Sequence, residues 1–208
     1  MYRVLNTKRK IILIICIVLT IILMGLWIFR SSSVNSAAFR QEVQHYSTGD
    51  NVELDGNFFF DGKENTNGYS IRVNSAEIKD YKEFLKSYGK KDEDLYDIKY
   101  VCLLNITVKN EGNDTGYLSA MGFALYNGAV QLPLDFEIWN LIDEFIDGNM
   151  VLKLRKDSEV TLTLPFTAQV SDEEVNSDKL NHRIENDTFE FVVSDFPIRK
   201  LIEVKFQS

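Results

Sequence analysis

The sequence predicts a mainly β protein: an antiparallel β-sandwich with one or two short helical insertions, preceded by a single N-terminal transmembrane helix. Three observations lead to this prediction. Residues 11–29 form an uncharged apolar run. From Tyr69 onward, short stretches alternate polar and apolar residues with the period of half-buried strands, separated by turn signals such as Asn127-Gly128. Helices do not separate each pair of these stretches, which disfavours a parallel α/β sheet.

The apolar run from Ile11 to Phe29 is long enough to cross a bilayer as a helix. At about 1.5 Å per residue it reaches roughly 28 Å, close to the hydrocarbon thickness of a membrane. Trp27 lies near the outer end, where interfacial aromatic residues are common, and Arg30 follows the run directly. We therefore predict an uncleaved anchor in which Ile11, Trp27 and Phe29 contact lipid.

The orientation of this anchor is predicted by charge. The first 30 residues contain no acid, and four basic residues precede the run: Arg3, Lys8, Arg9 and Lys10. An excess of basic residues marks the cytoplasmic side, so residues 1–10 are expected to be a cytoplasmic tail and the C-terminal domain extracellular, on a single-pass cell-membrane protein. Cleavage of a signal peptide after Ala38 remains an alternative, although the apolar region is longer than the usual one of about 7–15 residues.

Residues 30–56 contain serines and little periodicity, and we expect a stalk or linker there, with some helix around residues 38–46. Residues 57–208 then form the sandwich domain. The chain beyond residue 30 carries 18 basic and 31 acidic residues, a formal net charge of −13. Such a surface repels phosphates, so no nucleic acid partner is expected.

Alternating residues predict the individual strands. Residues 98–110 are apolar on both faces over their first half, as a central strand would be. Apolar spacing of three and four residues predicts short helices over residues 79–88 and 136–145. Residues 171–185 are expected to be an acidic connection. The remaining predicted strands are 69–78, 117–126, 130–134, 151–154, 159–166, 188–193 and 200–206.

No catalytic residue, metal ligand or cofactor is predicted. The chain has two histidines, His45 and His182, and lacks a G-x-S-x-G elbow or a zinc-like spacing of His and Cys. Cys16 lies in the apolar run and Cys102 in a predicted strand, so no disulfide framework is expected. Acidic clusters at residues 92–94, 143–147 and 172–174 match no calcium-loop pattern; solvated faces are the first interpretation and a divalent-ion site the second.

One stretch is a candidate for partner contact. Phe136, Trp139 and Phe145 recur at helical spacing. A stripe of this kind normally packs into the core, which is one interpretation. If it is exposed instead, an apolar patch containing a Trp indicates a binding surface, and the three residues would contact a partner.

Five segments in this order resemble a known family: NGYSIRVNSAEI, YVCLLNITVKNEGND, GFALYNGAVQLPL, KDSEVTLTLPFTA and TFEFVVSD. They are similar to an immunoglobulin-like extracellular domain of unknown function, carried by lipoproteins and membrane-anchored surface proteins of Gram-positive bacteria. That domain is similar in fold to the immunoprotective secreted antigens of mycobacteria. The resemblance covers roughly residues 67–206 and implies an immunoglobulin-like sandwich without catalytic residues. The chain departs from lipoprotein members because it lacks a lipidation motif.

These features together predict a non-enzymatic, membrane-anchored binding domain on a bacterial cell surface. Its expected partners are the lipid bilayer, through the N-terminal helix, and a protein or cell-envelope component. An accessory subunit of a membrane transporter or export system is the alternative, with residues 11–29 as the interaction surface. Replacing residues 11–29 with an unrelated anchor would distinguish the binding domain from the accessory subunit. Full retention of activity would count against the accessory subunit. A remote alternative is an envelope hydrolase.

Overall fold

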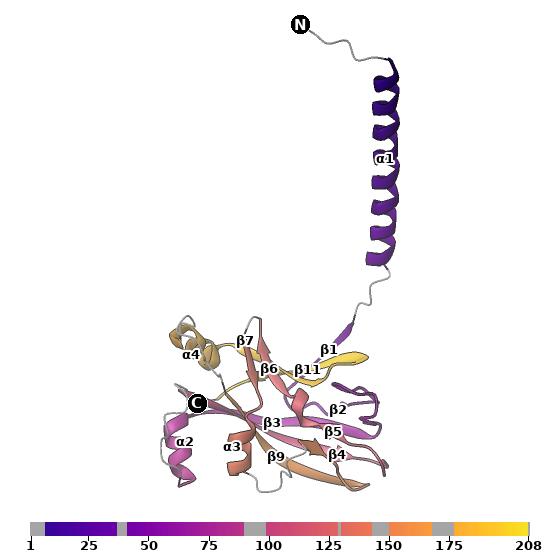
Figure 1. Cartoon of the computed structure of the whole chain (residues 1–208). Coiled ribbons are helices and arrows are strands. Elements are labelled where there is room, and N and C mark those ends of the chain that lie inside the picture. The colour runs from indigo at the N-terminus through magenta and orange to yellow at the C-terminus, as the bar shows by residue number, and fades with distance from the viewer. Residues whose placement is uncertain are drawn as a thin grey trace. The chain divides into compact units, whose positions relative to one another are not determined.

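The computed structural model describes residues 7–36, 41–89, 99–128, 130–142, 150–167 and 177–207. The chain divides into two compact units, Met1–Arg40 and Gln41–Ser208. The first contains one helix and the second contains every strand (Figure 1). Each unit is described by itself below.

The first unit contains helix α1 (Thr7–Ser36). Residues Lys10–Ser32 have a mean hydropathy of 3.2 and are long and apolar enough to cross a membrane. Side chains from Lys10 to Arg30 are exposed all around the helix. A helix that is apolar on every side suits a lipid environment. The helix continues past Phe29, so the first residues of the predicted stalk are helical.

The second unit is a sandwich of two sheets, and the predicted antiparallel β-sandwich is confirmed. A five-stranded sheet has the order β1-β11-β10-β6-β7, and a four-stranded sheet has the order β2-β3-β4-β9. In Figure 1 the five-stranded sheet forms the upper layer of this unit and the four-stranded sheet the lower layer. Strands β5 and β8 pair separately. The pairings are antiparallel except that of β1 with β11, which is parallel.

The bounds of the strands follow the predicted segments closely after residue 69. They are β1 (Glu42–Ser47), β2 (Val52–Glu53), β3 (Tyr69–Asp80), β4 (Tyr100–Asn110), β5 (Leu118–Ser119), β6 (Ala124–Asn127), β7 (Val130–Pro133), β8 (Val151–Leu152), β9 (Ser158–Thr167), β10 (Thr188–Ser194) and β11 (Ile198–Lys205).

The core lies between the two sheets. Successive side chains of a strand point to opposite faces, so alternate residues of the central strands enter the core, whereas β1 at the edge of its sheet has no fully buried residue. The Phe191 ring from β10 lies 5.2 Å from that of Phe123 and 5.9 Å from that of Phe166 on β9, measured between centroids. Other fully buried residues of the core include Ile71, Leu104, Ile106, Val108, Leu125, Leu164, Phe189 and Ile202.

A second apolar cluster explains why β4 is apolar on both faces. Strand β4 lies between β3 and β9, which confirms the prediction of a central strand. Helices α2 (Tyr81–Ser87) and α3 (Phe136–Ile142) supply Phe84 and Ile138, which cluster with Val101 and Leu103 of β4, away from the main core. Both helices occupy regions predicted to be helical.

The prediction of a linker over residues 30–56 is wrong beyond residue 41. Strand β1 occupies residues expected to be stalk or helix, and its Glu42 pairs with Ile198 of β11. Strand β2 pairs with β3. The folded unit therefore begins at Gln41 and not at residue 57. The partner of β1 is the last strand of the chain, and no local pattern reveals a pairing so distant in sequence.

Two other elements differ from the prediction. Helix α4 (Ser177–Asn186) lies within the stretch expected to be an acidic connection, and it buries Leu180 and Ile184 in the main core. A short 3-10 helix, η1 (Ala120–Gly122), interrupts the strand expected over residues 117–126. Each element has few buried residues, and its other residues are polar or small. A few buried residues are enough to stabilise such an element in the fold, but they leave little periodic pattern in the sequence.

Candidate functional site: an apolar groove beside Phe60

The loop between β2 and β3 is fixed at its base by buried polar side chains. Asn57 Oδ1 accepts a hydrogen bond of 2.9 Å from the Ile198 N–H of β11. Thr66, which is fully buried, donates its hydroxyl to the Asn57 carbonyl at 2.7 Å. Buried polar groups of this kind are stable only when they are hydrogen-bonded, so they define one conformation of the loop base.

The carboxylate of Glu64 holds the tip of this loop. Glu64 is 2% exposed. Its Oε1 accepts from the N–H groups of Phe60 at 2.9 Å and Asp61 at 3.3 Å. Its Oε2 accepts from those of Phe59 at 3.4 Å and Ser119 at 3.3 Å. These backbone donors compensate the loss of hydration of a buried carboxylate and attach the loop to β5.

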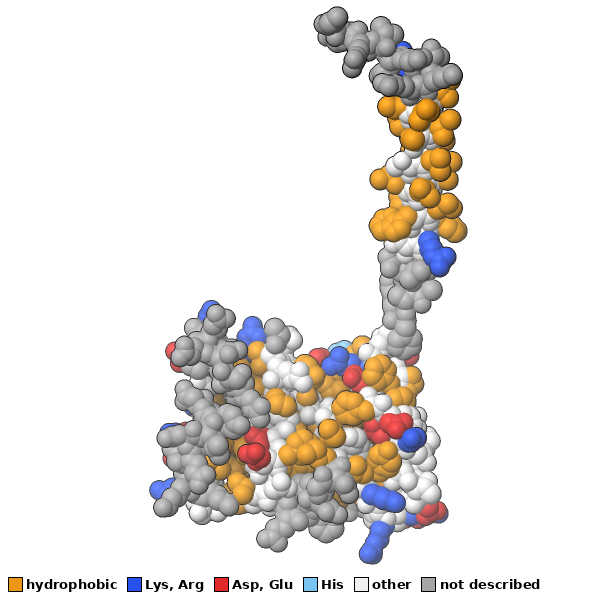
Figure 2. All heavy atoms as spheres, in the orientation of Figure 1, with side chains coloured by type: hydrophobic (Ala, Val, Ile, Leu, Met, Phe, Trp, Pro, Cys, Tyr) orange, Lys and Arg blue, Asp and Glu red, His pale blue; other side chains and the backbone are white. Residues whose placement is uncertain are grey.

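The fixed loop presents an apolar surface to solvent. Phe60 is 67% exposed, Met121 is 59% exposed and Phe196 is 44% exposed. Phe196 joins the loop because its N–H donates to the Phe58 carbonyl at 2.8 Å and its own carbonyl accepts from the Phe58 N–H at 2.6 Å. We call Phe60, Met121 and Phe196 the apolar patch. Figure 2 shows hydrophobic side chains gathered on the visible face of the folded unit.

An apolar groove of about 260 Å³ adjoins the patch. Phe60 and Met121 belong to both features, while Phe136 of α3, Tyr126 of β6 and Pro133 of β7 also line the groove. Gln131 and Asp195 also line the groove, so its aromatic and aliphatic side chains stand beside polar groups. A concave surface that combines apolar walls with a few polar groups is typical of a binding site. The groove therefore offers both apolar surface and hydrogen-bonding groups to a ligand.

Three acidic side chains of this part of the domain are paired with bases, whereas Glu64 accepts from backbone N–H groups. Asp195 Oδ1 lies 3.5 Å from Arg199 Nε, and the Arg199 guanidinium lies 5.3 Å from the centre of the Tyr126 ring. The Lys63 ammonium lies 3.9 Å from Asp61 Oδ2. In a third pair, the buried Lys200 on β11 reaches Asp55 Oδ2 at 2.8 Å and also donates to the Glu53 carbonyl.

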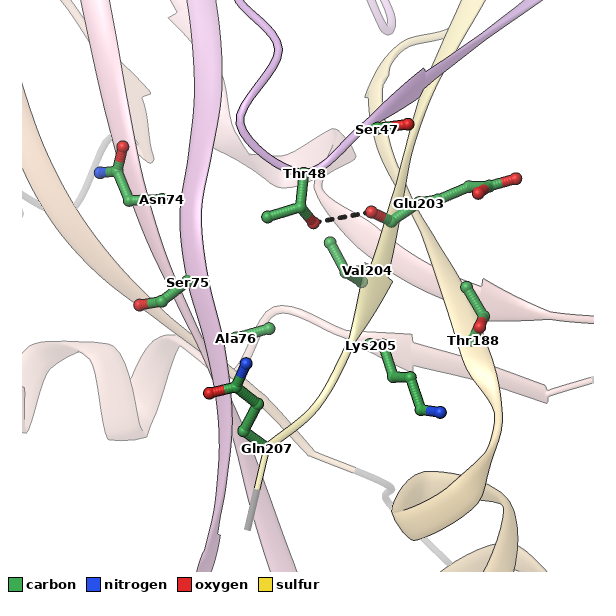
Figure 3. Close-up of a pocket in the computed structure, with 10 residues that line it drawn as sticks. All are labelled: Ser47, Thr48, Asn74, Ser75, Ala76, Thr188, Glu203, Val204, Lys205 and Gln207. Atoms are coloured by element: carbon green, nitrogen blue, oxygen red, sulfur yellow. Dashed lines mark hydrogen bonds between the residues drawn. The ribbon is translucent and has the colours of Figure 1, made fainter.

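A second cavity, of about 430 Å³, lies between β3 and β11 (Figure 3). The Thr48 hydroxyl donates to the Glu203 carbonyl at 2.8 Å, and the Gln207 N–H donates to the Ala76 carbonyl at 3.1 Å. In Figure 3 the side chains of Asn74 and Lys205 point away from the space between the strands, to opposite sides. The polar groups do not converge, so we interpret this cavity as the gap between the two sheets, closed by the end of the chain.

The structure separates the three residues predicted to contact a partner. Trp139 is fully buried in the core, which agrees with the core interpretation of this stripe and removes it from any contact surface. Phe136 is half-buried and lines the groove, with its ring centroid 6.0 Å from that of Trp139. Phe145 lies outside the described residues, as do the acidic clusters at 92–94, 143–147 and 172–174.

The predicted anchor residues lie along α1. Ile11, Trp27 and Phe29 are all more than half exposed, and Lys10 is exposed near the start of the helix. Lys8 and Arg9 lie in the first turns of α1, while Arg3 lies outside the described residues. The helix thus presents the apolar surface that a membrane anchor requires.

The patch residues were not predicted from the sequence: Phe60, Met121 and Phe196. One signal was available: Phe58, Phe59 and Phe60 form an aromatic run next to an Asp-Gly turn and outside any alternating strand. Such a run cannot bury all its rings in one core. Met121 and Phe196 carried no comparable signal, because only the fold places them beside Phe60.

Cys102, His45 and His182 lie on three different elements: β4, β1 and α4. Burial raises the pKa of the Cys102 thiol, which makes it a poor nucleophile. His45 Nδ1 lies 3.2 Å from Glu190 Oε1 on the exposed sheet surface, and His182 contacts Asn186 on α4. Within the described ranges, no three His, Cys, Asp or Glu side chains gather where they could hold a metal ion.

The fold defines a β-sandwich domain with a surface groove beside Phe60, on a chain whose described residues include one helix long and apolar enough to cross a membrane. Residues 43–200 match the family described as a domain of unknown function, DUF5028, and the chain belongs to this family.

Two solved structures from Bacillus subtilis are similar to the chain. The yjhA protein is 14% identical with a TM-score of 0.41, and the match covers 77% of this chain and 99% of that one. A putative lipoprotein, ycdA, is 16% identical with a TM-score of 0.38, and the match covers 66% of this chain and 36% of that one. A search of curated proteins finds no match.

Proposed function

We propose that this chain is a non-enzymatic, membrane-anchored domain of a Gram-positive cell surface that binds a protein or another component of the cell envelope through the apolar groove. The observation that carries this proposal is the exposure of Phe60 on a loop fixed by Glu64. An apolar side chain that is held in place before binding loses little conformational entropy when it is buried by a partner. Fixed aromatic side chains of this kind commonly dominate binding energy.

The topology of the anchor is part of the proposal. The uncleaved helix α1 would cross the cell membrane once, with the N-terminus in the cytoplasm and the sandwich outside. The basic residues Lys8, Arg9 and Lys10 at its start support this orientation. Protease added to intact cells should digest the sandwich and leave a membrane-protected fragment of α1. Protection of the whole chain would contradict the orientation.

We also infer that the sandwich is immunoglobulin-like and is related in fold to the secreted antigens of mycobacteria. Two facing, mainly antiparallel sheets with a shared aromatic core support this inference. An experimental structure of the domain tests this inference. The parallel pairing of β1 with β11 can then be compared with the strand pairing of those antigens.

Site-specific photocrosslinking in intact cells tests the proposed function. A photoreactive phenylalanine at position 60 should form adducts with an envelope protein or lipid. Position 88 is the matched control, because Tyr88 is 43% exposed and lies at the end of α2, outside the groove. Adding Phe136→Ser, which removes part of the groove, should reduce the adducts at position 60 severalfold. Equal labelling at positions 60 and 88 would contradict the proposal.

A further inference from the structure

The groove beside Phe60 has a negative charge at its wall. Asp195 lines the groove, and among the described lining residues it is the one with a charged side chain. Its backbone N–H donates to the Phe58 carbonyl at 3.0 Å, and its own carbonyl accepts from the side-chain amide of Gln41. These hydrogen bonds fix the backbone of Asp195, so a cation that enters the groove meets a carboxylate that is already in position.

A second carboxylate lies behind the same wall. Glu64 Oε1 accepts from the Phe60 N–H at 2.9 Å and Glu64 Oε2 from the Phe59 N–H at 3.4 Å. Both phenylalanines line the groove. The backbone groups that bind Glu64 stabilise its charge but carry no net charge of their own. Because Glu64 is buried, solvent screens it weakly, and its negative field extends into the groove.

Aromatic side chains supply much of the remaining wall, and one of them already holds a cation. Phe123, Tyr126 and Phe136 line the groove. The Arg199 guanidinium lies 5.3 Å from the centre of the Tyr126 ring, and its Nε lies 3.5 Å from Asp195 Oδ1. That nitrogen is buried and makes no hydrogen bond to a described residue. An aromatic ring and a carboxylate placed in this way attract a positive group, and Arg199 satisfies that attraction incompletely.

The size of the groove indicates a side chain of a larger partner and not a free small molecule. Its volume of about 260 Å³ is below the roughly 300–1,000 Å³ of pockets that enclose a small ligand. Phe60 and Met121 are largely exposed, and a partner that covers them must be broader than the groove. The chain beyond residue 30 has a net charge of −13, which favours the approach of a basic partner.

We propose that the groove binds a lysine or arginine side chain of a partner polypeptide, held by Asp195 and the aromatic walls. An apolar neighbour of that basic residue packs on Phe60 and Met121. This inference rests on the proposed function and names the chemistry of its partner. The carboxylate and the aromatic rings replace the water that the cation loses on entry. Arg199 competes with the incoming cation for Asp195 and Tyr126.

Binding of defined peptides to the full chain in detergent micelles tests this inference. A 4-fluorophenylalanine at position 60 reports binding by fluorine NMR. Three probe peptides with blocked ends have the sequence Gly-Leu-X-Leu-Gly, in which X is lysine, norleucine or glutamate. Norleucine keeps the four-carbon side chain of lysine and lacks its ammonium group. Butylammonium is the fourth probe and presents the same side chain without a polypeptide.

The lysine peptide should bind at least about threefold more tightly than the norleucine peptide, and the glutamate peptide should bind most weakly. Asp195→Asn should abolish the preference for lysine over norleucine. Glu190→Gln is the matched control: both carboxylate side chains are 39% exposed, and Glu190 lies on β10 and does not line the groove. It should retain the preference. A preference that survives Asp195→Asn, with native folding verified by near-ultraviolet circular dichroism, would overturn the inference.

The proposed competition is tested by removing the internal cation. Arg199→Gln should raise the affinity for the lysine peptide at least about twofold, because Asp195 and Tyr126 are then free to bind it. Lys99→Gln is the control, since it removes a cation that lies 4.5 Å from the centre of another ring, that of Tyr100. A lower affinity after Arg199→Gln would contradict the competition.

The two proposals fail in different ways. Equal binding of the lysine and norleucine peptides would leave an apolar binding groove, so the cation inference would be wrong while the proposed function stands. Butylammonium that binds as tightly as the lysine peptide would assign the groove to a small cation and exclude the polypeptide partner. If no probe binds although position 60 forms adducts in cells, the cation inference alone is wrong. If neither binding nor adducts appear, both proposals are wrong.

Discussion

The carboxylate of Glu64 accepts a 2.9 Å hydrogen bond from the backbone N–H of Phe60, so one of the most buried acidic residues holds one of the most exposed aromatic residues in place. The ring of Phe60 contacts that of the neighbouring Phe59, with 6.3 Å between the centroids, and is otherwise largely exposed. Its position depends on the hydrogen bonds of its own backbone, because those bonds set the direction in which the side chain leaves the loop. We therefore expect stability and the proposed binding to be separable in this loop, with Glu64 supplying the first and Phe60 the second.

Replacing Glu64 with Gln should destabilise the domain while leaving Phe60 chemically intact. The amide has one accepting oxygen in place of two, so some of the four N–H groups lose their partner. Those of Phe59 and Ser119 are buried, and each unsatisfied buried group costs about 1–3 kcal/mol. We expect the free energy of unfolding to fall by about 2 kcal/mol in urea titrations monitored by Trp139 fluorescence in a Trp27→Phe background. Glu77→Gln, at an exposed pair with Lys79, should change it by under about 0.5 kcal/mol.

The complementary variant Phe60→Ser should leave the free energy of unfolding nearly unchanged, because the side chain is 67% exposed. A loss as large as that of Glu64→Gln would show that the ring contributes to packing, and the separation of roles would then be wrong.

Gly122→Ala should disturb the groove. A Cβ atom at Gly122 would lie 2.1 Å from Cγ of Phe59, far inside van der Waals contact, so Phe59 has to move. We expect a loss of about 2 kcal/mol or more in stability from overpacking. Gly62→Ala is the matched control, since the nearest atom to its Cβ would be Phe58 Cε1 at 3.9 Å. Similar unfolding midpoints for the two variants would contradict this account.

Trp139→Ala should unfold or strongly destabilise the domain, whereas Phe136→Ala should not. Trp139 is fully buried, and truncating a buried Trp costs about 3–5 kcal/mol. Phe136 is half-buried and lines the groove, so we expect a loss of roughly 1–2 kcal/mol together with weaker binding. Denaturant titrations of both variants measure the difference. A Trp139→Ala protein of normal stability would show that this residue is not part of the core.

Acid should weaken the contact between α4 and β4. The hydroxyl of Tyr100 donates to the Glu185 carboxylate, which lowers the pKa of that carboxyl, and the Lys99 ammonium at 3.6 Å adds to the effect. Because the pKa of Glu185 is lower in the folded than in the unfolded state, its ionised carboxylate stabilises the fold. This stabilisation is fully present at a pH above the unfolded-state pKa of 4.5, and it is lost as the pH falls through the lower pKa of the folded state. The urea midpoint of Glu185→Gln should therefore lie slightly below that of the unchanged chain at pH 7 and converge with it in acid.

Tyr100→Phe provides the control for this pH dependence. It removes the main hydrogen bond and should reproduce most of the effect, with little further change when Glu185→Gln is added. A midpoint difference that is constant with pH would exclude titration of Glu185 as the cause.

Local patterns were sufficient for the long strands and for two helices. Strand β4 was predicted almost to its ends because it alternates over eleven residues and because its first half is apolar on both faces. Strand β1 was not predicted because its place in the sheet depends on pairing with β11. Helix α4 was not predicted because it contributes just Leu180 and Ile184 to the core. An edge strand or a short helix with few buried residues has no distinctive period of its own.

The candidate site was predictable only in part. Phe136 was singled out by its spacing and does line the groove, but the same spacing selected Trp139, which the fold buries. Helical periodicity places residues on one face of a helix, and it does not say whether a neighbouring sheet covers that face. Phe60, Met121 and Phe196 come from three separate segments and meet only in the folded domain.

By itself, then, the sequence determined the apolar helix, the sandwich class and the central strand, because each depends on how apolar residues repeat along a continuous segment. The tertiary structure decided where the domain begins, which aromatic side chains are buried and where the groove lies. Those properties depend on contacts between residues far apart in the chain, such as Gln41 with Asp195 and Phe58 with Phe196, and no local repeat encodes them.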